Sequence, residues 1–375
     1  MAMRSYKFRI EPNKTQAALF SEMLADFCQL YNAGLEHRIM AYANGVSIRC
    51  NDQMTSLPQI RKELPHQGRW SATAQQQVLR KLDKTYQAFF GRIKRGAKAG
   101  FPRFRARDRY HAADFRVGDG MTIRKTGKLG FVGVPGEIKV RWHRELPSKP
   151  KSAILSRNAG KWYVIFHVDV APIERATPDS VGIDLGLTSL MALSNGETVA
   201  RPNITKRNAR KLRRLQRAMA RCKFGSTVRR KRKAAVAKPQ AYIAARRRDF
   251  LHKESRKIVN RFGRIAIEDL NIKGLASGML AKHVNDAAWA QLTAMLAYKA
   301  ASAGCEFVKV DPRGTSQTCP ECGTIAAKTL AERTHRCDCG CVLDRDVAAA
   351  KVMHFRAFGF LPGAGSESLI ERVAA

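Results

Sequence analysis

The 375-residue sequence lacks any sustained apolar run and is poor in acidic residues, with 31 Asp and Glu against 68 Lys and Arg. A transmembrane helix needs about 20 consecutive apolar residues, so none is predicted. The first residues also lack the apolar core of a signal peptide, and we therefore expect a cytoplasmic protein. We find no internal repeat. Because 45% of the residues are hydrophobic, the composition excludes a wholly disordered chain.

The shortage of acids leaves a formal net charge of +37. Self-repulsion on this scale opposes a compact fold unless a polyanion neutralises it. Nucleic acid is the expected partner, because Lys and Arg bind phosphates and release condensed counterions. An anionic membrane surface is the alternative, but the sequence contains no amphipathic anchor.

The positive charge is densest at 206–257, where 21 Lys and Arg accompany two acids. Apolar residues there keep helical spacing, and Gly225 and Pro239 interrupt it, which predicts two long basic helices around a flexible joint. A charge run is usually a solvated face, but this one carries half of the protein's excess charge. We expect it to bind nucleic acid, with the candidate contact residues Arg210, Arg213, Arg214 and Arg217.

The hydrophobic period divides most of the chain into strands and helices. Strands are predicted at 5–10, 122–123, 138–142, 154–156, 162–170, 181–184, 190–193, 264–268 and 306–310, and helices at 15–43, 72–93, 286–303 and 345–358. The short strands between 109 and 170 fit a small β-barrel or sheet domain. Residues 172–178 are predicted to form a linker, and residues 361–375 a loose tail.

A second basic segment, at 92–105, interleaves cations with Gly, Pro and two Phe. This composition favours contact with a nucleic-acid backbone, supported by aromatic rings, and a solvated basic loop is the alternative. Its candidate contact residues are Arg103 and Arg105. The helix at 72–93 has a polar flank that we expect to remain free for a partner, with the candidates Gln75, Gln76 and Lys81.

Five of the nine cysteines lie within 23 residues. Cys319 and Cys322 form one knuckle, and Cys337 and Cys339 form a second one after 14 intervening residues. Four thiolates at this spacing predict a structural, tetrahedral zinc site in a mini-domain too small to bury a core of its own. The second knuckle is compressed, and Cys341 is an alternative fourth ligand.

Four acids stand at the ends of predicted elements. Asp184 closes one apolar strand, Glu268 closes another, and Asp344 and Asp346 stand at a helix start. Acids placed in this way can converge at one edge of a sheet and hold two Mg²⁺ or Mn²⁺ ions for phosphodiester hydrolysis. Taken alone, each acid is better explained as a helix cap or a surface salt-bridge partner.

Three segments resemble the motifs of a split RuvC-type nuclease with an RNase H-like fold. They are VGIDLG at 181–186, IAIEDLN at 265–271 and DRDVAAA at 344–350. Between the second and the third, VDPRGTSQTCPECG at 310–323 resembles the corresponding segment of TnpB proteins. TnpB proteins are RNA-guided DNA nucleases encoded by bacterial and archaeal insertion sequences, and they are related to the type V CRISPR effectors. YKFRIEP at 6–12 and GFPRF at 100–104 are also typical of the family.

This resemblance implies an α+β multidomain protein. An RNase H-like RuvC nuclease domain with an inserted zinc ribbon would follow a β-barrel wedge domain and a helical recognition lobe. The implied parts are a wedge strand at 1–10, the recognition lobe at 11–95, the β-rich wedge domain at 96–177, the RuvC domain at 178–312 and 344–360, the ribbon at 313–343 and a flexible tail at 361–375.

The resemblance also implies an RNA-guided, Mg²⁺-dependent DNA endonuclease, associated with the nucleoid of a prokaryote. A guide RNA from the transposon end would direct it to target double-stranded DNA beside a short flanking motif, with no small-molecule substrate. By motif match, the catalytic metal ligands are Asp184, Glu268 and Asp346, with Asp346 preferred to Asp344.

The third motif departs from the family, which usually has Asn where this chain has Ala348 and Val352. A polar residue there could orient the acid or its metal, so its loss bears on the level of activity. One alternative is a cleavage-deficient RNA-guided repressor that binds DNA. Another, an unguided zinc-ribbon DNA-binding factor, leaves the three acids without a role. Retention of all three acids favours the nuclease.

Overall fold

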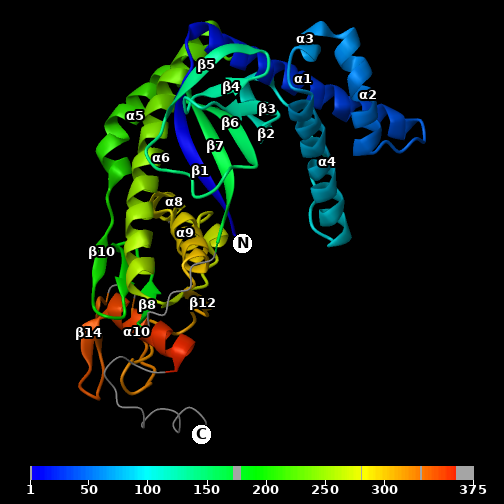
Figure 1. Cartoon of the computed structure of the whole chain (residues 1–375). Helices are drawn as coiled ribbons and strands as arrows, with labels where there is room; N and C mark the ends of the chain where they lie inside the picture. Colours follow the sequence, from blue (N-terminus) through cyan, green and yellow to red (C-terminus); the bar gives the residue numbers. More distant parts are fainter. Residues whose placement is uncertain (1, 172–178, 280, 330–331, 360–375) are drawn as a thin grey trace. The chain divides into compact units, whose positions relative to one another are not determined.

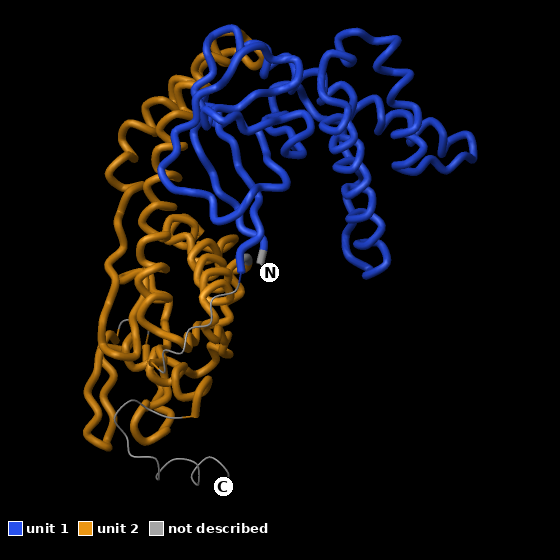
Figure 2. Tube along the Cα trace, in the orientation of Figure 1, with its two compact units in different colours: residues 1–171 blue, residues 172–375 orange. Residues whose placement is uncertain are grey.

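The computed structural model describes residues 2–171, 179–279, 281–329 and 332–359. The chain forms two compact units, residues 1–171 and 172–375, which Figure 2 draws in separate colours. The predicted linker at 172–178 and the predicted tail at 361–375 lie outside the described residues. No helix in the described part of the chain combines the length and the apolar character needed to cross a membrane.

Unit 1 contains a closed barrel (Figure 1). Its strands are β1 (Ala2–Glu11), β2 (Ala112–Val117), β3 (Gly120–Ile123), β4 (Leu129–Phe131), β5 (Val134–Arg141), β6 (Ser152–Asn158) and β7 (Lys161–Val170). Their order is β1-β5-β4-β3-β2-β6-β7, and β1 closes the barrel because it pairs antiparallel with both β5 and β7. Alternate residues of β7 are buried, as expected for a strand with one face on a core. The predicted small barrel is confirmed, and the predicted N-terminal strand is part of it as β1.

The helices of unit 1 are α1 (Lys14–Ala43), α2 (Cys50–Glu63), α3 (Pro65–Gly68) and α4 (Ala72–Lys94), with a short 3₁₀ helix, η1 (Arg107–Arg109). α1 begins with a capping box, in which the Asn13 side chain accepts a hydrogen bond from the Gln16 nitrogen and the Gln16 side chain accepts one from the Asn13 nitrogen. The helices predicted at 15–43 and 72–93 are confirmed as α1 and α4. Sequence patterning does not predict α2, because Pro58 lies inside it and few of its residues are buried.

Unit 2 is built on a five-stranded sheet. Its strands are β8 (Ser180–Asp184), β9 (Ser189–Leu193), β10 (Thr198–Ala200), β11 (Arg264–Glu268) and β12 (Glu306–Val310), in the order β10-β9-β8-β11-β12. β9 pairs antiparallel with β8 and β10, whereas β11 pairs parallel with β8 and β12. The carboxyl ends of β8, β11 and β12 therefore lie at the same edge of the sheet.

Six helices and a hairpin complete the described part of unit 2. They are α5 (Ile204–Ala220), α6 (Thr227–Arg261), α7 (Ile272–Leu275), α8 (Ala281–Ala287), α9 (Trp289–Ser302), α10 (Arg345–Phe358) and the hairpin of β13 (Thr334–Arg336) and β14 (Val342–Asp344). The joint between the two basic helices contains Gly225, as predicted. The predicted interruption at Pro239 is wrong, because α6 continues through it. Pro239 is buried, and its packing offsets the backbone hydrogen bond that proline cannot donate. The helix predicted at 286–303 is divided at Ala288, whose φ of 55° interrupts it.

Candidate functional site

Two acids from distant parts of the chain lie side by side at one edge of the unit 2 sheet. Asp184 is the last residue of β8, and Glu268 is the last residue of β11. These strands are parallel, with Ile183 opposite Ile267, so the acids that follow are neighbours. Each acid is only 9% exposed. The register of two parallel strands therefore produces the convergence that the sequence led us to expect.

A third acid, Asp346, reaches the same edge from α10, which packs against β8 and β11. Asp344 caps this helix, because its Oδ1 accepts hydrogen bonds from backbone N–H groups of the first turn, that of Asp346 at 2.9 Å among them. The Oδ2 of Asp346 lies 3.3 Å from the position that a Cβ on Gly186 would take, two residues beyond Asp184. The structure thus joins Asp346 to the strand acids and uses Asp344 as a helix cap.

Burial and mutual repulsion oppose the ionisation of these acids. Burial, the charge of Glu268 and the charge of Asp346 raise the pKa of Asp184 to about 9. Burial raises the pKa of Glu268 to about 7, and burial with the charge of Asp344 raises the pKa of Asp346. A bound divalent cation supplies the positive charge that stabilises the carboxylates. Three oxygen ligands of this kind fit Mg²⁺ or Mn²⁺.

Thr315 is a member of this site that sequence analysis did not identify. It is 2% exposed, and its Oγ1 lies 3.5 Å from Oε1 of Glu268 and 2.9 Å from the carbonyl oxygen of Pro312. The hydroxyl therefore helps to orient Glu268 from the loop that follows β12. The signal in the sequence is its place within the TnpB-like segment at 310–323.

The three acids are spaced more widely than the ligands of a single compact site. Among the described residues, two groups of cysteine, histidine or acidic side chains place three or more ligand atoms within 4.8 Å of one another, and both groups are in the ribbon. Two ions held about 3.5–4 Å apart require ligands around a larger volume. The wider spacing of the acids is therefore compatible with a pair of ions.

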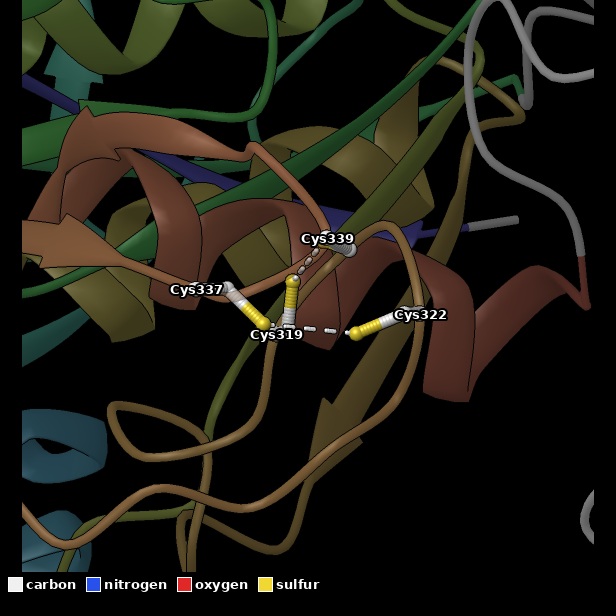
Figure 3. Close-up of side chains that lie close together, drawn as sticks. All are labelled: Cys319, Cys322, Cys337 and Cys339. Carbon is white, nitrogen blue, oxygen red and sulfur yellow. Dashed lines mark hydrogen bonds between the residues drawn. The ribbon is translucent and has the colours of Figure 1, made fainter.

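The ribbon brings four cysteine sulfurs together (Figure 3). The Sγ atoms of Cys319, Cys322, Cys337 and Cys339 all lie within 4.8 Å of one another. The Cys319–Cys339 distance is 3.7 Å, and the Cys322–Cys337 distance is 3.4 Å. A tetrahedral zinc ion with bonds of about 2.3 Å places its sulfurs about 3.8 Å apart. The four sulfurs fit zinc, and the fourth ligand in this group is Cys339 and not Cys341.

The basic helix α5 presents its cations to solvent. None of its residues is buried, and the four candidates Arg210, Arg213, Arg214 and Arg217 are all exposed. α5 packs against α6, the second of the two basic helices. Guanidinium groups on such a face can reach the phosphates of a polyanion without any rearrangement of the fold.

In unit 1, the prediction that Gln75 is free to contact a partner is wrong. Its side chain is fully buried, its Nε2 donates to the Gln67 carbonyl oxygen at 3.0 Å, and its Oε1 accepts a hydrogen bond from Arg61. The position on α4 looked polar and therefore exposed, but the hydrogen bonds to Gln67 and Arg61 satisfy the amide inside the core. Gln76 is half-buried, and Lys81 retains an accessible side chain.

Lys81 lines a groove of about 540 Å³ between α4 and strands β2 and β6 of the barrel. The charged residues that line it are Arg80, Lys81, Lys84, Asp114, Arg116 and Lys151. The cations outnumber the acid, whose Oδ2 lies 3.6 Å from Nζ of Lys81. A groove with this balance of charge suits a phosphate backbone.

The basic segment at 92–105 is anchored at its end. The side chain of Asn32 in α1 makes two hydrogen bonds with the backbone of Arg105. Its Oδ1 accepts from the Arg105 nitrogen at 2.8 Å, and its Nδ2 donates to the Arg105 carbonyl oxygen at 2.9 Å. The Arg105 guanidinium lies 4.7 Å from the Tyr31 ring centroid, and Arg103 is exposed. Arg103 is therefore open to a partner, whereas Arg105 is partly engaged within the unit.

Three protein families match parts of the chain. Residues 1–46 match the helix-turn-helix domain of OrfB_IS605, residues 165–278 match OrfB_IS605, described as "Probable transposase", and residues 289–353 match the Cas12f1-like TNB domain. The second match contains Asp184 and Glu268, and the third contains the ribbon cysteines and Asp346. Residues 1–46 here form β1 and the single long helix α1.

Similarity to two curated proteins extends over most of the chain. A Streptomyces pristinaespiralis protein named "Putative RNA-guided DNA endonuclease" is 35% identical over 93% of this chain and 88% of its own length. The Escherichia coli (strain K12) protein "Putative RNA-guided DNA endonuclease InsQ" is 27% identical over 89% of this chain and 87% of its own length. Among solved structures, a chain of the "Cas12f1-sgRNA-target DNA complex" has a TM-score of 0.57 at 14% identity, over 91% of this chain and 83% of that one. This last similarity shows a common fold.

Proposed function

The chain belongs to the TnpB (OrfB_IS605) family, and on that basis we propose that it is an RNA-guided DNA endonuclease that cleaves target DNA beside a short flanking motif. The names of its relatives support the guided-nuclease class. In this proposal, unit 2 holds an RNase H-like RuvC domain at 178–312 and 344–360, with the zinc ribbon at 313–343. The wedge, at 1–10 and 96–177, would contain the β-barrel, and the recognition lobe, at 11–95, would contain the helices α1 to α4.

One observation carries the catalytic part of the proposal. Asp184, Glu268 and Asp346 come from two parallel strands and a helix that are far apart in the sequence, yet they share one edge, where Asp184 and Glu268 are buried and Asp346 is half-buried. Burial of several carboxylates in one place is unfavourable unless cations bind there. A helix cap or a surface ion pair, the simpler role for each acid alone, does not account for this grouping.

The residues around the acids define how the site would work. Two bound Mg²⁺ or Mn²⁺ ions would supply an activated water and would stabilise the leaving oxygen of the scissile phosphodiester. Asp184 and Glu268 would hold these ions at a fixed edge of the sheet, because both belong to hydrogen-bonded strands. Thr315 would restrict the rotation of Glu268, and the Asp344 cap would fix the first turn of α10, from which Asp346 projects.

The positive charge would hold guide RNA and target DNA. In this scheme, base pairing selects the target sequence, so the protein needs only contacts to the backbone of the heteroduplex. The exposed arginines of α5 and the basic groove of unit 1 provide such contacts. The four-cysteine zinc site would have a structural role, since protein ligands fill all four of its positions.

A cleavage-deficient repressor that binds DNA through its RNA is the second candidate. The observation that favours it is Ala348, which stands where the family usually has Asn and is 1% exposed in α10, two residues after Asp346. No amide is available at that position to orient the acid or its metal. Because the three acids remain grouped, we favour the nuclease.

The test uses protein co-expressed with the DNA that flanks its gene, so that it is purified with its own RNA. The complex would receive Mg²⁺ and a guide-matched plasmid that carries a randomised flank. We expect linear product from wild type and none from Asp184→Ala. The control is Asp269→Ala, which should also give linear product, because Asp269 is an exposed acid next to Glu268 that pairs with Lys309. RNA-dependent binding without cleavage by any of these proteins would support the repressor, and Ala348→Asn would then be the first variant to assay.

A further inference from the structure

The ribbon contains a second group of potential metal ligands that overlaps the first. A ring nitrogen of His335 and the sulfurs of Cys319 and Cys341 all lie within 4.8 Å of one another. Cys319 belongs to both groups, so the two possible metal positions share one thiolate. Neither His335 nor Cys341 is needed for the four-cysteine site.

The two groups differ in their exposure to solvent. In the first group Cys339 is exposed, and Cys322 and Cys337 are half-buried. In the second group all three side chains are buried, with exposed fractions of 2% for Cys319, 0% for His335 and 3% for Cys341. A metal in the second position would thus be shielded from water and from competing ligands.

The imidazole of His335 has an unused coordination capacity. Its Nε2 is buried and has no hydrogen-bond partner within the described residues. A buried polar atom without a partner normally costs free energy, so such atoms in native proteins often mark a ligand or ion position. Its Nδ1 contacts Nζ of Lys328, which also reaches the Ser316 carbonyl oxygen at 3.5 Å.

We propose that Cys319, His335 and Cys341 form an alternative zinc site, which retains the metal in the ribbon when the exposed ligands of the four-cysteine site are lost. Imidazole nitrogen and thiolate are both zinc ligands, and a site with three protein ligands leaves the fourth position to water. The ion would remain bound to Cys319 while it exchanges its other ligands. The neutral imidazole would bind through Nε2 with its proton on Nδ1, and Lys328 would turn toward the Ser316 carbonyl.

This inference concerns the ribbon alone and does not depend on nuclease activity. The decisive variant is Cys322→Ser with Cys339→Ser, which removes two of the four ligands of the first site and none of the second. We expect it to retain about one zinc ion per chain, measured by elemental analysis of the purified full-length protein. Retention would point to the second group, because the four-cysteine site keeps only two of its ligands. Loss of the zinc would overturn the proposal, because Cys319, His335 and Cys341 are all intact in this variant.

Two further variants identify the ligands. Adding Cys341→Ser, or His335→Gln, to the double variant should abolish zinc retention, whereas each of these substitutions alone should leave the zinc of the intact four-cysteine site in place. Zinc that persists in both triple variants would exclude the assigned ligands. Since His335 is buried, the Cys341→Ser series remains decisive if the His335→Gln protein does not fold.

Cobalt substitution gives an independent readout. In the double variant two thiolates and one nitrogen would bind Co²⁺, so its sulfur-to-metal charge-transfer absorption should fall to about half of the wild-type intensity. Its visible bands should also shift to shorter wavelength, because nitrogen and oxygen ligands split the d orbitals more strongly than sulfur. A spectrum identical to that of wild type would contradict a change of ligand set.

Discussion

The backbone of Gly182 in β8 lies directly against the backbone of Ala350 in α10. A Cβ at position 182 would overlap the carbonyl oxygen of Ala350 and would lie 2.8 Å from the His354 nitrogen. Glycine therefore allows α10 to approach the sheet closely. Because Asp346 lies one helical turn before Ala350, this approach also brings its carboxylate to the edge where Asp184 ends β8.

Gly182→Ala should consequently disrupt both packing and the site. The added methyl group must push α10 from the sheet, at a cost of about 1–3 kcal/mol in the free energy of unfolding. We expect DNA cleavage to fall more than RNA binding, because the displacement separates Asp346 from the strand acids. Gly278→Ala is the control, since a Cβ there meets no atom within 4 Å. Unchanged cleavage by Gly182→Ala would show that the position of α10 does not govern the site.

Mg²⁺ should stabilise the protein through the three acids. Ions that neutralise the buried carboxylates bind only the folded chain, and each tenfold excess over the dissociation constant adds about 1.4 kcal/mol. Thermal unfolding with and without Mg²⁺ measures this gain. Asp184→Asn should be more stable than wild type at neutral pH without metal, because burial raises the pKa of Asp184 to about 9 and the wild-type carboxyl must therefore take up a proton on folding. It should also gain less from Mg²⁺. Asp269→Asn should respond as wild type does, and an equal gain in all three proteins would place the ions elsewhere.

The arginines of α5 should control the salt dependence of RNA binding. Each phosphate contact contributes roughly 0.7–0.9 to the slope of log affinity against log salt concentration. Arg210→Gln with Arg214→Gln should therefore lower the slope by about 1.5, with similar effects on different guide sequences. The control is Lys253→Gln, whose Nζ already pairs with Asp249 at 3.0 Å. A slope that does not change would mean that α5 faces solvent in the RNA complex.

Lys299 should make stability depend on pH in the alkaline range. It is 4% exposed, and its Nζ donates to the His252 carbonyl oxygen and to Ser255 Oγ, both at 2.7 Å. Burial lowers the pKa of Lys299 to about 8, from 10.5. Between these values the unfolded chain binds more protons than the folded one, so this group's contribution to the free energy of unfolding rises with pH.

Lys299→Met isolates that contribution. The variant should match or exceed the stability of wild type at neutral pH, where the wild-type lysine is buried with a charge. Its advantage should then shrink as the pH rises above about 8, because the wild-type amine becomes neutral. Denaturant unfolding of both proteins across this range measures the difference. A constant difference would show that Lys299 keeps its ordinary pKa in the fold.

Local patterns in the sequence predicted much of the structure. Cysteine spacing predicted the four-sulfur cluster, because two knuckles hold their thiolates close together whatever the rest of the chain does. Hydrophobic period predicted α1, α4 and four of the five strands of the unit 2 sheet but not β10, and residue composition located the basic helices. Each of these features depends on neighbours within a few residues or a few turns.

Other features depended on contacts between distant segments. The parallel register of β8 and β11 places Glu268 beside Asp184, and the Gly182 contact lets α10 bring Asp346 to them. Gln75 has the polar character of a surface residue, but hydrogen bonds to Gln67 and Arg61 allow it to be buried. Hydropathy and spacing report what one segment prefers. The energy of a buried amide or a shared acidic edge depends on which partners the fold supplies, and those partners lie elsewhere in the chain.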